Sequence, residues 1–159
     1  MIDFNRLLLA LVKGKVEFVI VGGVAANLHG SARLTMDLDV VYGRSKENIR
    51  RLVRALAPLQ PYLRGAPSGL PFHFDVETVN AGLNFTLTTN AGPLDLLGEM
   101  VGGFTYEVVA KRSKFVMLSG MRCRVIDVDA LIEAKLAAGR PKDLEVIAEL
   151  EIIREERDG

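Results

Sequence analysis

The chain has 159 residues with 20 basic and 20 acidic side chains, so its formal net charge is zero. This balance excludes the strongly basic composition of a protein that attracts nucleic acid over its whole surface. Hydrophobic residues make up 49% of the chain, which is enough for a sizeable core and predicts a folded single domain over residues 1–159.

Cysteine usage and hydropathy bear on the compartment. Cys123 is the only cysteine, so no internal disulfide can form, which fits a reducing environment. Neither a signal peptide nor an apolar run of about 18 residues is recognisable. We therefore expect a cytoplasmic protein without a membrane partner.

The first predicted elements are a helix over 3–13, a buried strand over 18–21 and a short helix over 24–29. The strand and the second helix are joined by Gly22 and Gly23. A helix N-terminus offers unpaired N–H groups and a positive dipole end, which suits a phosphate, and glycine lets a ligand approach the backbone. Most such turns only reverse the chain, so the neighbouring residues decide between the two readings.

Polar and apolar residues alternate from residue 33 to residue 40, which predicts a strand. The face directed to the core would carry Leu34, Met36, Leu38 and Val40, and the opposite face Arg33, Thr35, Asp37 and Asp39. The two aspartates would lie roughly 6.5–7 Å apart at Cα, within reach of the same divalent cations. A half-exposed strand has the same pattern. However, Asp is depleted in strands and like charges repel, which favours a cation, an arginine partner or water beside the pair.

The middle of the chain contains a second acidic pair. A helix over 46–56 is followed by residues 58–71, which are rich in proline and glycine and predict a long structureless loop, a mobile flap near the substrate. Asp75 and Glu77 then compete with the first pair for a metal role. We prefer Asp75 as the N-cap of a helix over 76–81.

A third candidate carboxylate lies in the second half of the chain. Strands are predicted over 83–88 and 93–97, and a hairpin over 115–118 and 123–125. Asp95 is flanked by leucines, and an unpaired buried carboxylate is costly, so a cation or strong donors should accompany it. The alternative is an aspartate that caps a turn.

The C-terminal part is predicted to be helical. Asp129 is expected to cap a helix over 130–138, and a last helix is expected over 142–156. Lys135 is placed near the apolar side of its helix. It is a candidate contact for a triphosphate, and equally a surface lysine whose stem lies along the core.

These motifs resemble a known superfamily. The blocks that carry the resemblance are Gly22-Gly23-x-Ala25, His29-Gly30 and Arg33-x-Thr35-x-Asp37-x-Asp39. They are similar to the nucleotidyltransferases with a DNA polymerase beta-like fold, and most similar to the bacterial branch of AbiEii-type toxin-related proteins. Residues 92–97 resemble that group's third-carboxylate segment, and residues 131–144 its C-terminal helical motif. The resemblance spans about residues 16–150.

The resemblance implies an α/β (α+β) fold with a small mixed β-sheet flanked by helices. Its core would cover about residues 16–125 and a C-terminal helical part about residues 127–157. It implies that Asp37, Asp39 and Asp95 are catalytic and hold Mg²⁺ or Mn²⁺. The implied nucleotide-binding residues are Gly22, Gly23, Arg33, Thr35 and Lys135. Many relatives carry Ser at the second turn position, whereas Gly23 offers only its backbone N–H.

The implied activity is transfer of an NMP from an NTP to an acceptor hydroxyl, with release of pyrophosphate. Acceptors in the superfamily include RNA, proteins and small molecules, and several members act in toxin–antitoxin pairs. A homodimer or a cognate toxin–antitoxin partner is therefore expected. The alternative is a non-catalytic nucleotide-binding or antitoxin-like interaction protein of the same fold.

Overall fold

A central mixed sheet organises the computed structural model, which describes residues 2–158. Its seven strands run in the order β3-β4-β5-β2-β1-β9-β8. They are β1 (Phe18–Val21), β2 (Leu38–Tyr42), β3 (Tyr62–Leu63), β4 (Phe85–Thr88), β5 (Leu94–Leu97), β8 (Ser113–Leu118) and β9 (Met121–Ile126). A separate two-stranded ribbon joins β6 (Glu99–Met100) and β7 (Phe104–Thr105). The predicted α/β fold with a mixed sheet and flanking helices is confirmed.

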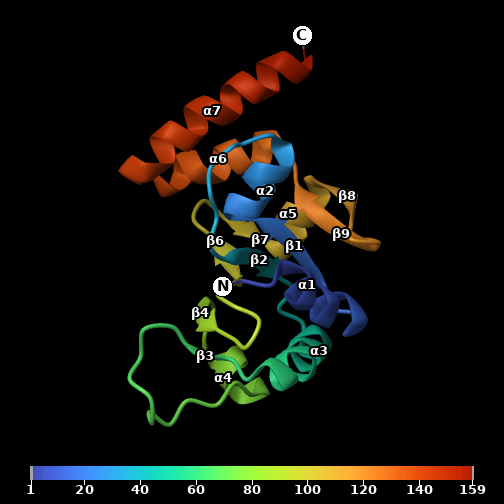
Figure 1. Cartoon of the computed structure of the whole chain (residues 1–159), viewed down its shortest axis with the longest axis vertical. Helices are drawn as coiled ribbons and strands as arrows, with labels where there is room; N and C mark the ends of the chain where they lie inside the picture. Colours follow the sequence, from blue (N-terminus) through green and yellow to red (C-terminus); the bar gives the residue numbers. More distant parts are fainter. Residues whose placement is uncertain (1, 159) are drawn as a thin grey trace.

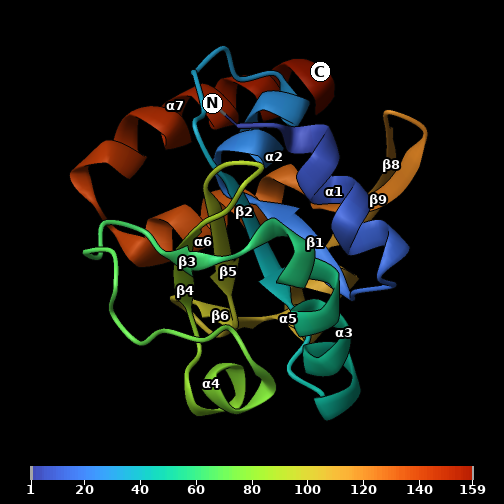
Figure 2. The ribbon, with the colours of Figure 1, turned by 60° about the horizontal axis from the view of Figure 1, so that its bottom comes forward.

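Apart from α5, which packs on strands, the helices form two groups (Figure 1). They are α1 (Phe4–Lys13), α2 (Gly22–His29), α3 (Lys46–Leu56), α4 (Val76–Ala81), α5 (Tyr106–Lys111), α6 (Val128–Ala138) and α7 (Pro141–Asp158). Helices α2, α6 and α7 pack on one another, and α1 packs on α3, as Figures 1 and 2 both show. Among residues 2–158, no helix combines the length and the hydrophobicity needed to cross a bilayer.

The core follows from the apolar pattern of the strands and helices. All four residues of β1 are buried, and so are Leu38, Val40 and Val41 of β2. On one side, α1 and α3 each bury an amphipathic stripe, formed by Leu7, Leu8 and Leu11 in α1 and by Ile49, Leu52 and Leu56 in α3. Burial of these side chains supplies most of the driving force for folding.

The predicted strand over 33–40 is wrong in its first half. Strand β2 begins at Leu38, and residues 31–36 are irregular. Leu34 and Met36 are 88% and 63% exposed instead of entering the core. The cause is a lack of neighbours: β1 ends where α2 begins, and Pro93, just before β5, has no N–H to donate. The Asn27 side chain instead binds the carbonyl oxygens of Ser31 and Arg33.

The predicted structureless loop over 58–71 is also partly wrong. It contains the 3₁₀ helix η1 (Ala57–Leu59) and the edge strand β3. The stretch after β3 does project from the fold as a loop (Figure 2). It is attached through Tyr62, whose hydroxyl donates to Pro67 O at 2.6 Å and accepts from Leu70 N at 3.1 Å.

Other sequence predictions concern helix caps. Asp75 caps α4 by accepting from Thr78 N at 2.8 Å, as expected. The cap of α6 is Asp127, which accepts from Ala130 N at 2.7 Å, so the prediction of Asp129 is wrong. Asp129 lies two residues after the cap, within the first turn of α6, and pairs with Arg154. The hairpin is present as β8 and β9.

Candidate active site

Three carboxylates converge at one end of the central strands. Asp37 directly precedes β2, Asp39 belongs to β2, and Asp95 belongs to β5. Strands β2 and β5 are parallel, and their register pairs Asp39 with Asp95. Paired residues on neighbouring strands point to the same face, so both carboxylates reach the same space. One oxygen atom from each of Asp37, Asp39 and Asp95 lies within 4.8 Å of the others.

The carboxylates of the cluster repel one another, and burial adds to the cost of their charges. Burial, followed by the charges of Asp37 and Asp95, raises the pKa of Asp39 to about 8. Burial and the neighbouring Asp95 also raise the pKa of Asp37. Within residues 2–158, the Oδ1 atom of Asp39 is buried without a hydrogen-bond partner. A buried polar atom without a partner is costly, so this position calls for a ligand.

The Gly22-Gly23 turn lies directly against these carboxylates. Gly22 has a φ of +65°, and a Cβ atom added there would be 2.1 Å from Asp39 Oδ2. Only glycine combines that conformation with so close an approach. A Cβ atom on Gly23 would be 2.6 Å from Thr35 Oγ1, and that hydroxyl donates to Asp37 O at 3.2 Å. The turn, Thr35 and the carboxylates therefore form one compact unit.

The same turn begins α2 without a side-chain cap. The N-cap residue, Val21, makes no side-chain hydrogen bond to the first turn of the helix. The first N–H groups of an α-helix have no partner within the helix, and they point along its axis toward the N-terminus. An anion placed here would meet both these donors and the positive end of the helix dipole.

The donor set suits a hard divalent cation. Mg²⁺ and Mn²⁺ prefer carboxylate oxygen ligands, and the cluster offers one oxygen from each of three aspartates. The partnerless Asp39 Oδ1 is the specific atom that such an ion would satisfy. An anion site at α2 and a cation site at the aspartates lie side by side, which matches the two halves of a metal–triphosphate complex.

Lys135 approaches the site from α6. Its side chain is only 14% exposed, and its Nζ lies 3.7 Å from Asp143 Oδ1. Burial lowers the pKa of Lys135, while the charges of Asp143 and Asp39 oppose that shift. The guanidinium of Arg140 also donates two hydrogen bonds to Asp143, of 2.8 and 3.2 Å. The buried Asp143 thus fixes two cations on the side of the cluster formed by the C-terminal helices.

One predicted site residue, Arg33, and the two rival acidic residues lie outside the carboxylate cluster. Arg33 is engaged by α7, where it pairs with Glu145 at 3.2 Å and Glu149 at 3.5 Å. These ion pairs connect the segment before β2 to the last helix. In the rival acidic pair, Asp75 caps α4 and Glu77 lies in its first turn, and neither is a member of the carboxylate cluster.

Arg64 is a member of the site that sequence reasoning missed. Its Nη2 lies 2.7 Å from Asp95 Oδ1, and its Nη1 lies 3.7 Å from Asp37 Oδ2. In the sequence, Arg64 is one of many basic residues and stands in a stretch of prolines and glycines. Its only local signal is the short run Tyr62-Leu63 before it, which could have been interpreted as an edge strand bringing Arg64 next to β4.

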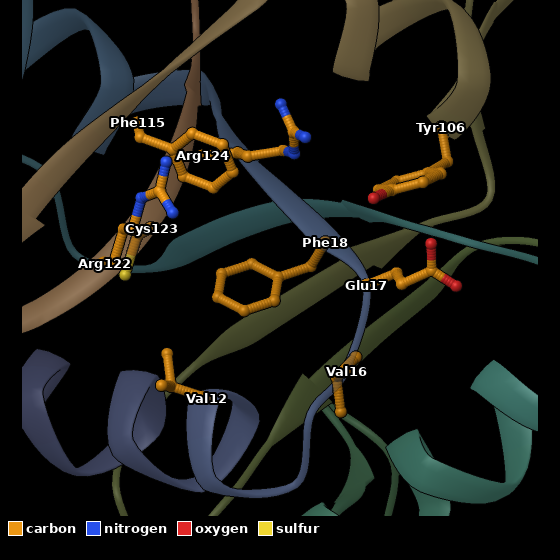
Figure 3. Close-up of a pocket in the computed structure, with 9 residues that line it drawn as sticks. All are labelled: Val12, Val16, Glu17, Phe18, Tyr106, Phe115, Arg122, Cys123 and Arg124. Carbon is orange, nitrogen blue, oxygen red and sulfur yellow. The ribbon is translucent and has the colours of Figure 1, made fainter.

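One cavity of the fold lies away from the carboxylates. It has a volume of about 240 Å³, and none of the predicted site residues lines it. Figure 3 shows Arg122 and Arg124 against the Phe115 ring on one side and Glu17 and Tyr106 on the other. The cavity is at the end of β1 where Phe18 lies, whereas Val21, at the other end, pairs with Asp39. The candidate site is the half-buried carboxylate cluster together with the Gly22-Gly23 turn.

Similar solved structures agree with this architecture. A provisionally assigned nucleotidyltransferase from Thermotoga maritima superposes with a TM-score of 0.58 at 17% identity, covering 94% of each chain. ANT(2")-Ia in complex with adenylyl-2"-tobramycin gives a TM-score of 0.55 at 14% identity, covering 96% of this chain and 93% of that one. At these identities the likeness shows the fold.

The family assignment rests on a match over nearly the whole sequence. No curated protein sequence matches the chain. The family model described as "Nucleotidyltransferase of unknown function (DUF6036)" matches residues 2–156, nearly the whole length. The chain therefore belongs to this nucleotidyltransferase family.

Proposed function

We propose that the protein is a metal-dependent nucleotidyltransferase that moves an NMP from an NTP to an acceptor hydroxyl and releases pyrophosphate. The observation that supports this most is the convergence of Asp37, Asp39 and Asp95 beside the Gly22-Gly23 turn. The family assignment and the fold neighbours support nucleotidyl transfer in general. The proposed toxin–antitoxin setting and the AbiEii-type branch rest on the sequence motifs alone.

Each part of the site has a role in this proposal. Asp37, Asp39 and Asp95 supply the oxygens that would hold Mg²⁺ or Mn²⁺. Such ions neutralise the triphosphate and activate the acceptor hydroxyl. The N–H groups at the start of α2, with Thr35 beside them, bind the phosphate tail, and Lys135 adds a positive charge. Asp95 accepts the proton of the acceptor hydroxyl. Positioning and charge neutralisation account for the rate.

The proposed acceptor is a molecule with a hydroxyl group, either RNA, a protein or a small molecule. The similar structure of ANT(2")-Ia is a complex with adenylyl-2"-tobramycin. A search for the acceptor should therefore include small molecules. A homodimer or a cognate partner protein is the proposed source of missing acceptor contacts.

The test is transfer of label from α-³²P-NTPs to a cell extract or to tobramycin in the presence of Mg²⁺. Asp37→Asn should reduce labelling by on the order of 100-fold or more, because the remaining carboxylates would hold less well the metal ions that neutralise the charge of the transition state. The matched control is Asp75→Asn, which removes a carboxylate that caps α4 outside the cluster. Equal labelling by Asp37→Asn and wild type would contradict the proposal.

One observation favours a second candidate, the non-catalytic nucleotide-binding protein. Arg64 already pairs with Asp95, so the cluster is partly neutralised by the chain itself. This candidate predicts that NTPs bind but that no acceptor is labelled. Isothermal titration with a non-hydrolysable NTP, run beside the labelling assay, separates the two candidates.

A further inference from the structure

The guanidinium of Arg64 lies within the carboxylate cluster and is oriented there by hydrogen bonds to the backbone. The backbone N–H of Arg64 donates to Thr86 O at 3.0 Å, which continues the pairing of β3 with β4. Its side chain is held by Leu87 O, which accepts from Nε at 3.2 Å and from Nη2 at 2.7 Å. The guanidinium is thus oriented by backbone groups before it reaches any carboxylate.

The guanidinium engages two of the three aspartates. Nη2 donates to Asp95 Oδ1 at 2.7 Å, and Nη1 lies near Asp37 Oδ2. These carboxylates belong to the cluster that would hold a divalent ion. An arginine and a metal at one carboxylate group repel each other and compete for the same oxygens. The ion pairs of Arg64 are with Asp37 and Asp95, and Asp39 keeps its Oδ1 without a hydrogen-bond partner.

We propose that Arg64 is the resident counter-cation of the cluster and competes with the divalent metal for Asp95 and Asp37. Arg64 thereby weakens binding of the metal alone, so that metal loading depends on the negative charge of the incoming triphosphate. Binding of the metal displaces the guanidinium from Asp95. This inference rests on the proposed metal site and adds a control of its occupancy.

The first experiment measures Mn²⁺ affinity by electron paramagnetic resonance, without nucleotide. Arg64→Gln should bind Mn²⁺ about tenfold more tightly than wild type, because one nearby positive charge is gone. Arg64→Lys keeps the charge and should stay near the wild-type affinity. The control Arg44→Gln removes an arginine that is also held by a backbone carbonyl, Val79 O, but lies beyond the other end of β2. It should leave the affinity unchanged.

The outcomes separate this inference from the proposed function. Mn²⁺ binding by wild type with equal or weaker binding by Arg64→Gln overturns the competition and leaves the metal site standing. Absence of binding in both proteins overturns the inference, because removal of Arg64 would then not release a site for the metal alone, and the proposed function is tested separately by the labelling assay. Tighter binding by Arg64→Gln and by Arg44→Gln alike would indicate a general charge effect and would also overturn the inference.

A second measurement needs only the wild-type protein. Phenylglyoxal modifies accessible guanidinium groups, and mass spectrometry locates the modified arginines. Mg²⁺ should increase the modification rate of Arg64 severalfold and leave that of Arg44 unchanged, because only Arg64 would be released from a carboxylate. An Arg64 rate that is unaffected or decreased by Mg²⁺ would show that the guanidinium stays in place.

Discussion

Thr35 and Gly23 share a space that holds only one side chain. A Cβ atom on Gly23 would lie 2.6 Å from Thr35 Oγ1 and 3.0 Å from Thr35 Cβ. In many relatives a serine hydroxyl is expected at this turn, whereas here the hydroxyl beside the turn belongs to Thr35. The effect of a substitution at residue 23 on stability should therefore depend on which side chain is present at residue 35.

A double-mutant cycle tests this dependence. Gly23→Ser should lower the free energy of unfolding by about 1–3 kcal/mol, because the new side chain overlaps Thr35. Thr35→Ala should relieve part of the overlap, so that the double variant is more stable than the sum of the single changes by about 1 kcal/mol. Urea unfolding of the four proteins gives the coupling. Strict additivity would mean that the turn moves away from Thr35.

At the scale of elements, the length of β2 decides which residues reach the core. Pairing with β1 and β5 covers only residues 38–42, so the alternating pattern upstream has no strand beside it. Leu38 is fully buried, while Met36, two residues earlier and on the same predicted face, is largely exposed. The pattern of the sequence is the same at both positions, and only the neighbours differ.

Two alanine substitutions compare these positions. Leu38→Ala should cost about 2–5 kcal/mol of unfolding free energy, because it leaves a cavity in the core. Met36→Ala should change stability by less than about 0.5 kcal/mol, as is usual at exposed sites. Thermal or urea unfolding measures both. A large loss in Met36→Ala would mean that the strand extends upstream in solution.

At the scale of the whole molecule, the sheet gathers negative charge at one site, although the chain as a whole is neutral. The net charge is zero, yet Asp95 is brought to Asp37 and Asp39 so that one oxygen of each lies within 4.8 Å of the others. Burial and these neighbours raise the pKa of Asp39 from an ordinary 3.8 to about 8. The folded protein therefore binds a proton on Asp39 that the unfolded chain releases at lower pH.

The sign of this linkage gives a prediction for stability. In the metal-free protein, the stabilising contribution of the Asp39 proton is complete below pH about 4 and is lost as the pH rises through about 8. Unfolding free energy in EDTA should therefore fall by on the order of a few kcal/mol from pH 5 to 8.5. Asp39→Asn should remove most of this slope.

The control for the pH series is Asp129→Asn, because Asp129 is an exposed carboxylate paired with Arg154. This variant should keep the wild-type slope. An equally flat profile for wild type and Asp39→Asn would show that Asp39 titrates normally.

The sequence by itself determined the α/β class, most of the helices and central strands, and three acidic positions in a recognisable order. These features depend on local periodicity, caps and turn residues, which the chain carries within short windows. The sequence also predicted the role of Asp75 as an N-cap, because an N-cap interacts only with the next turn of its own helix.

Only the tertiary structure decided the rest. Strand β2 starts at Leu38 because β1 and β5 offer no partners further upstream. Arg64 entered the site because β3 pairs with β4, which places residue 64 next to Asp95, 31 residues away along the chain. Strand neighbours and ion pairs between distant residues depend on long-range pairing, and no local pattern in a single sequence encodes them.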